Sequence, residues 1–133
     1  MEKDSKNIKP QAGDLVFVYG TLKAGFYNHR VMQYAKGSFV SRATTTKAFP
    51  MIDGGFPYLY DEEGVGNEIV GEVYQIPTEQ GFSPLDGLEG YPHHYTRRKV
   101  GVVLSDEGDK TVDAWVYFAN HERQTDELIS EFR

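Results

Sequence analysis

The hydrophobic residues lie in short runs, most of which predict strands. Residues 14–19 are apolar without alternation, which is typical of a strand buried on both faces. Residues 98–104 and 111–118 are separated by a polar connection that contains glycine, and they predict a β-hairpin. Residues 37–49, rich in Thr, Val and Phe, and residues 70–76 predict further strands. Strands therefore dominate the expected fold.

Helical signals are few and short. Asn28 is a candidate N-cap for a helix through about Lys36, and Ser83 followed by Pro84 is a start signal for a second one. Residues 125–132 carry apolar side chains on one side of a third. Prolines and glycines mark residues 50–57 as a loop. We expect an α+β fold, a curved and largely antiparallel sheet or barrel with two or three short helices.

The length of 133 residues fits one domain, which we place at residues 14–133 after a flexible lead-in at residues 1–13. The chain has no cysteine, which excludes disulfides, thiolate metal sites and a cysteine nucleophile. Lys and Arg number 14 against 20 Asp and Glu, for a net charge of −6, so we expect neither nucleic-acid nor membrane binding. The polar N-terminus lacks the apolar stretch of a signal peptide, and we expect a cytoplasmic protein.

The first candidate for chemistry is the segment of residues 19–29. A buried strand ends at Gly20, and small or polar residues lead to Gly25. Such a turn can direct several backbone N–H groups the same way, a geometry that binds a carboxylate or an oxyanion. The structural alternative is an ordinary strand-to-helix connection whose glycines only provide a positive φ.

The second candidate is the segment of residues 83–92. Asp86 falls three residues after Ser83, where its carboxylate can cap the helix, so we expect a structural role for it. Glu89 follows one turn later and the helix stops at Gly90, so a partly desolvated Glu89 with a raised pKa could act as general base. The alternatives are a solvated surface glutamate, or a glycosidase-like carboxylate pair of Asp86 and Glu89.

The histidines have no metal-ligand spacing, since His29 is isolated and His93 and His94 are adjacent. We expect no metal and no cofactor. The nucleophile-elbow pattern of Ser/His/Asp hydrolases is also missing from the sequence.

Taken together, the motifs resemble the gamma-glutamylcyclotransferase-like (AIG2-like) family, most closely its gamma-glutamylaminecyclotransferase branch. The resemblance rests on four sequence motifs that occur in the family's order: VFVYGTLK with a downstream Gly25 and Asn28-His29-Arg30, then Phe56-Pro57, GEVY at residues 71–74, and LDGLEGYP at residues 85–92 with Tyr95 and Arg97.

The resemblance implies a small mixed, mostly antiparallel β-barrel with a few short helices. It implies cyclisation of a γ-glutamyl amide, such as γ-glutamyl-lysine, to 5-oxoproline with release of the free amine and without a cofactor. Carried over by position, Glu89 is the acid/base residue, and His29 and Tyr95 are pocket neighbours. The residues that would hold the glutamyl head are Tyr19, Gly20, Thr21 and Leu22.

Two other functions stay open at this stage. The same barrel could serve as a non-catalytic ligand-binding or interaction module, or it could act on γ-glutamyl amino acids. The expected partner is a small molecule, and the sequence does not fix the oligomeric state.

Overall fold

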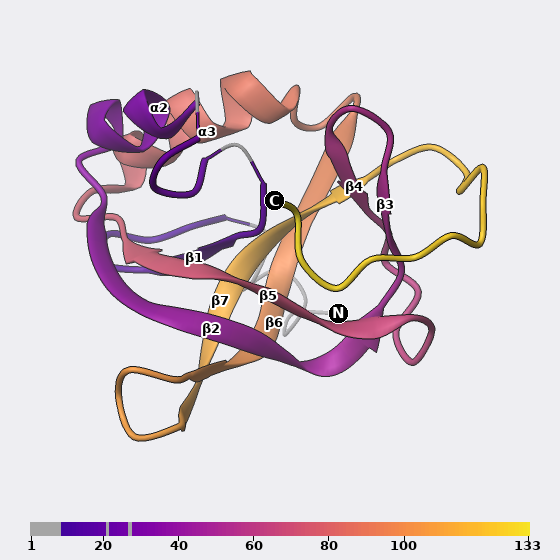
Figure 1. Ribbon diagram of the computed structural model, residues 1–133. Coiled ribbons are helices and arrows are strands. Elements are labelled where there is room, and N and C mark those ends of the chain that lie inside the picture. Colours follow the sequence, from indigo (N-terminus) through magenta and orange to yellow (C-terminus); the bar gives the residue numbers. More distant parts are fainter. Residues whose placement is uncertain (1–8, 21, 27) are drawn as a thin grey trace, which may run out of the picture.

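A computed structural model describes residues 9–20, 22–26 and 28–133. Within these residues, five strands close into a barrel (Figure 1). In barrel order they are β1 (Leu15–Val18), β5 (Asn67–Gln75), β2 (Ser38–Phe49), β6 (Tyr95–Leu104) and β7 (Lys110–Ala119). All neighbours are antiparallel except β1 and β7, which run parallel with Val16 opposite Trp115. The predicted mixed, mostly antiparallel barrel is confirmed.

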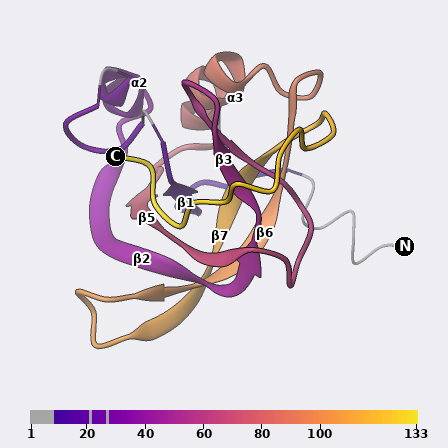
Figure 2. The same ribbon diagram turned by 45° about the vertical axis from the view of Figure 1, so that its right-hand side comes forward.

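The apolar run in β1 is explained by burial on both of its faces. Phe17 packs inside the barrel with Val116 of β7, whereas Val16 and Trp115 face outward into a second apolar cluster. Helices α2 (His29–Tyr34) and α3 (Phe82–Glu89) cover that cluster, and both lie toward one end of the barrel (Figures 1 and 2). Because the outer face lies under helices rather than water, the strand needs no polar alternation.

The loop predicted for residues 50–57 is wrong in part. Strands β3 (Met51–Asp53) and β4 (Pro57–Leu59) form a two-stranded antiparallel sheet beside the barrel. Gly54 and Gly55 make the turn between them, where the Gly55 N–H donates to the Asp53 carboxylate at 3.1 Å. The prolines and glycines therefore mark the ends of a short hairpin, which we name the flap, residues 51–59.

The helix predicted for residues 125–132 is also wrong. This segment runs without regular secondary structure past β3 and β4 (Figure 1). Its backbone bonds the body of the protein instead, since the Ile129 N–H donates to the Met51 carbonyl and the Val70 N–H donates to the Ser130 carbonyl, both at 2.9 Å. Eight residues form a marginal helix by themselves, so these tertiary bonds prevail over the amphipathic pattern.

The N-terminal lead-in predicted at residues 1–13 falls mostly on residues 1–8, outside the described residues. At its described end, the Gly13 N–H donates to the Ile76 carbonyl at 2.8 Å. None of the helices in the described part of the chain has the length and apolar character needed to cross a membrane.

Candidate active site

A cavity of about 390 Å³ opens at the end of the barrel where the helices lie. Its wall is built from the end of β1 with the loop that follows, the flap, the end of α3, and strands β6 and β7. The volume lies within the usual range of small-molecule sites. Segments far apart in the sequence thus meet around one pocket, and both candidate segments of the sequence analysis reach it.

Glu89 is the last residue of α3 and lines this cavity. The helix ends because Gly90 takes the left-handed conformation, with φ of 71°, which favours glycine. Burial raises the pKa of Glu89 to about 7, and its carboxylate forms no hydrogen bond or ion pair with the residues that the structure describes. A carboxyl group with such a pKa can both accept and return a proton near neutral pH.

Asp86 does not have the capping role expected for it. The turn before α3 starts at Thr78, whose hydroxyl accepts the Gly81 N–H at 3.1 Å, and Ser83 lies inside the helix. The Asp86 carboxylate instead accepts hydrogen bonds from Arg97 Nε at 3.1 Å and from the Tyr117 hydroxyl. Asp86 is not part of the wall of this cavity, and its carboxylate is occupied by Arg97 and Tyr117, which argues against a glycosidase-like pair with Glu89.

Three tyrosines that line the cavity lie close enough to Glu89 for its charge to act on them: Tyr19, Tyr95 and Tyr117. The Tyr19 hydroxyl donates to the Tyr117 carbonyl at 2.6 Å, which fixes the end of β1 against β7. Burial, and then the charge of Glu89, raise the pKa of Tyr19 and Tyr95 well above the ordinary value. Burial also raises the pKa of Tyr117. All three phenols therefore stay protonated at neutral pH and keep a hydrogen-bond donor.

The loop after β1 reaches the cavity through Gly20 and Leu22. Gly20 packs against the flap so closely that a Cβ atom there would lie 2.5 Å from Pro57 Cγ, so this position needs glycine. Thr21, the remaining residue of the expected glutamyl subsite, lies outside the described residues. His29 does not line the cavity, and its Nδ1 bonds the Leu22 carbonyl at 2.9 Å, behind the loop.

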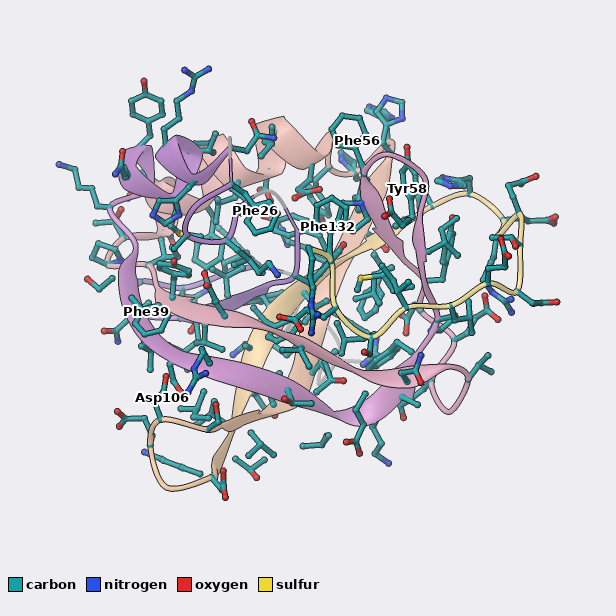
Figure 3. The ribbon with its side chains drawn as sticks, viewed as in Figure 1. Phe26, Phe39, Phe56, Tyr58, Asp106 and Phe132 are labelled. Atoms are coloured by element: carbon teal, nitrogen blue, oxygen red, sulfur yellow. The ribbon has the colours of Figure 1, made fainter. Side chains whose placement is uncertain are left out.

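Several residues of the wall had no site role of their own in the sequence analysis, among them Asn28, Tyr58, Leu88 and Tyr117. Asn28 holds the N-cap position of α2, but its side chain makes no capping bond. Figure 3 shows Phe56 and Tyr58 on the flap, far from Asp106 in the β6–β7 turn. The Phe56-Pro57 motif was the signal in the sequence for this part of the wall, and both residues line the cavity.

The described residues contain no group of three or more His, Asp or Glu side chains placed to hold a metal ion.

Comparison with known proteins supports the same family. The model of the family "Gamma-glutamyl cyclotransferase, AIG2-like" matches residues 16–132. A relative from Methanocaldococcus jannaschii, named a gamma-glutamylcyclotransferase by inference, is 41% identical over 106 residues, or 79% of this chain and 83% of that protein. The gamma-glutamylaminecyclotransferase of Mus musculus is 37% identical over 113 residues, or 77% of this chain and 75% of that protein.

The fold agrees with these sequence matches. The crystal structure of an AIG2-like protein from Mus musculus superposes with a TM-score of 0.82 at 28% identity, covering 92% of this chain and 89% of that one. The match of the family model at residues 16–132 includes the loop after β1, the flap and the end of α3. The chain belongs to the gamma-glutamyl cyclotransferase, AIG2-like family.

Proposed function

We propose that the protein cyclises a γ-glutamyl amide to 5-oxoproline and releases the free amine, with Glu89 as the acid/base residue. The observation that carries the proposal is the desolvated Glu89 carboxyl group, with a pKa of about 7, in the wall of a substrate-sized cavity. Membership of the family supports the reaction type.

In the proposed reaction, the Glu89 carboxylate takes a proton from the α-ammonium group of the substrate. The freed amine attacks the γ-carbonyl carbon, so that a C–N bond forms and the carbonyl oxygen becomes an oxyanion. As the oxyanion collapses, the original amide C–N bond breaks and Glu89 returns the proton to the departing nitrogen. The ring nitrogen, which bears an extra proton after the attack, gives that proton to the released amine, which leaves as an ammonium ion. No water is consumed, and the same carboxyl group is regenerated.

Much of the acceleration would come from holding the glutamyl group folded back on itself. Well-oriented intramolecular reactions reach effective molarities of roughly 10⁵–10⁸ M. The backbone N–H groups of Gly20 and Leu22, which line the cavity, are candidates to bind the α-carboxylate or the oxyanion. The protonated hydroxyl of Tyr95 is a further donor at the same wall.

The cavity wall favours a leaving group bonded through a simple or side-chain amine over an amino acid bonded through its α-amino group. Among the described residues of the wall, Glu89 alone carries a charged side chain, so these residues offer no cation to a carboxylate beside the scissile amide. Phe56 and Leu88 line the cavity and are 50% and 39% exposed, which provides apolar surface for an alkyl chain. A γ-glutamyl-ε-lysine isopeptide fits because its leaving-group carboxylate lies several carbons from the amide.

The test is 5-oxoproline release, followed by mass spectrometry, from γ-glutamyl-ε-lysine, γ-glutamyl-alanine and glutathione, with Glu89→Gln as control. We expect product from γ-glutamyl-ε-lysine and its loss in the variant. Product from γ-glutamyl-alanine alone would move the assignment to γ-glutamyl amino acids. Binding of 5-oxoproline without turnover of any of the three would contradict catalysis and favour a binding module.

A further inference from the structure

The GEVY motif contains two polar side chains that the proposed reaction does not use. Neither Glu72 nor Tyr74 lines the cavity. Glu72 Oε1 accepts a hydrogen bond from the backbone N–H of Ala24 at 2.9 Å and another from the Tyr74 hydroxyl at 3.0 Å. A side chain of β5 therefore holds the backbone of the loop after β1, which we name the cavity loop, residues 20, 22–26 and 28.

The register of the barrel explains why Glu72 can reach this loop. Glu72 pairs with Val18, the last residue of β1, so it stands beside the point where the chain leaves the sheet. Within the loop, the Lys23 N–H donates to the Gly20 carbonyl at 3.0 Å and the Phe26 N–H donates to the Lys23 carbonyl at 3.1 Å. These turns are internal, whereas the Ala24 bond ties the loop to the barrel.

Tyr74 also supports a second hydrogen bond to the backbone of the same loop. Its ring packs against the His29 imidazole with centroids 5.7 Å apart, and His29 Nδ1 bonds the Leu22 carbonyl at 2.9 Å. Since a carbonyl only accepts, this nitrogen carries the proton. Burial raises the pKa of Tyr74 well above its ordinary value, so its hydroxyl stays a donor to Glu72. Tyr74 thus supports two hydrogen bonds of the loop: its hydroxyl orients Glu72, and its ring packs against His29.

We infer that Glu72, oriented by Tyr74, is a positioning residue that fixes the cavity loop and thereby holds Gly20 and Leu22 at the cavity wall. The inference rests on the proposed function insofar as those two residues would bind the glutamyl head. Small displacements of a binding group cost a large part of the rate, because the reaction depends on orientation. Glu72 itself touches no substrate in this arrangement.

The first experiment does not depend on activity. Amide hydrogen exchange at Ala24, measured by NMR, is compared in the parent protein, Glu72→Met and Glu72→Gln. We expect exchange about tenfold faster in Glu72→Met, which lacks the acceptor, and near-parental exchange in Glu72→Gln, whose amide oxygen still accepts. Glu68→Met, at an exposed position of the same strand, is the matched control and should leave Ala24 unchanged.

The second experiment measures the rate constants for γ-glutamyl-ε-lysine and the dissociation constant of 5-oxoproline. In Glu72→Met we expect kcat/KM about tenfold lower with a raised KM and weaker 5-oxoproline binding, and in Glu72→Gln values within about threefold of the parent. Tyr74→Phe should lie between the two. A purely structural role would instead lower the folded fraction, and with it kcat, at unchanged KM and unchanged 5-oxoproline affinity.

Several outcomes would overturn the inference. One is a folded Glu72→Met whose Ala24 exchange, KM and 5-oxoproline affinity all equal those of Glu68→Met. Another is a Glu72→Gln variant as impaired as Glu72→Met, because the acceptor oxygen is then not what matters. A parent protein that yields no 5-oxoproline contradicts the proposed reaction, and the Ala24 exchange then decides the positioning role by itself.

Discussion

The middle of α3 and its C-terminal end each carry a carboxylate, and the two surroundings differ sharply. At Asp86, the Arg97 guanidinium lies 3.1 Å from the carboxylate and also stacks on the Tyr91 ring, 3.9 Å from its centroid. The Tyr117 hydroxyl donates to the same carboxylate oxygen. At Glu89, one turn later, the carboxyl group faces the cavity and is desolvated.

This difference shows how one helix can provide both an anchor and the candidate acid/base group. The Asp86 carboxylate, which accepts hydrogen bonds from Arg97 and Tyr117, ties α3 to strands β6 and β7. A carboxylate that is buried without such partners is easier to protonate, which raises its pKa. The paired Asp86 therefore holds in place the helix that presents Glu89.

The largest expected effect is on turnover. Glu89→Gln removes the proton acceptor at constant volume, so kcat for 5-oxoproline release should fall by about 10²–10⁴-fold. Asp86→Asn should stay within about tenfold of the parent, because Asp86 lies outside the cavity wall. Steady-state kinetics of both variants make the comparison. The opposite pattern would mean that the two carboxylates have been assigned the wrong roles.

The next effect is on stability as a function of pH. The pKa of Glu89 is about 7 in the folded protein against an ordinary value of 4.5. Below about pH 4.5 the group is protonated in both states, and as the pH rises toward 7 the unfolded chain ionises first, so the folded state loses stability. Glu89→Gln stays neutral and should be more stable than the parent by about 1–3 kcal/mol at pH 8.

Urea denaturation at pH 4, 6 and 8 measures this difference between Glu89→Gln and the parent protein. We expect the two free energies of unfolding to agree near pH 4 and to diverge as the pH rises. A constant difference across the three pH values would mean that Glu89 titrates normally. The same ionisation predicts that kcat/KM rises as the pH passes through about 7, because only the carboxylate can take the proton.

The smallest expected effect concerns the anchor. Asp86→Asn replaces the charged partner of Arg97, whose side chain is only 8% exposed, so the free energy of unfolding should fall by about 1–2 kcal/mol. Urea denaturation of this variant, of Tyr117→Phe and of the double variant gives the coupling between the two groups. Additive losses, or no loss in Asp86→Asn, would show that the network does not anchor α3.

Patterns confined to one segment were predicted well. The strand at residues 14–19 was predicted from an unbroken apolar run, and the hairpin at residues 98–118 from two apolar stretches and the polar turn between them. Strands β1, β6 and β7 confirm both. Gly90 after Glu89 was sufficient to predict where α3 ends. The predicted C-terminal helix failed because that segment bonds residues distant in the sequence, as in the bond from Ile129 to Met51 of the flap.

The sequence by itself determined the strands of the barrel and singled out Glu89, because the helix stop and the surrounding motif are local and contiguous. Only the tertiary structure decided which carboxylate is paired, since Arg97 and Tyr117 come from β6 and β7. It also placed the flap against Gly20, and it placed the Glu72 side chain against the cavity loop. Desolvation and pairing depend on everything packed around a group, and that surrounding is assembled from segments that are not neighbours in the chain.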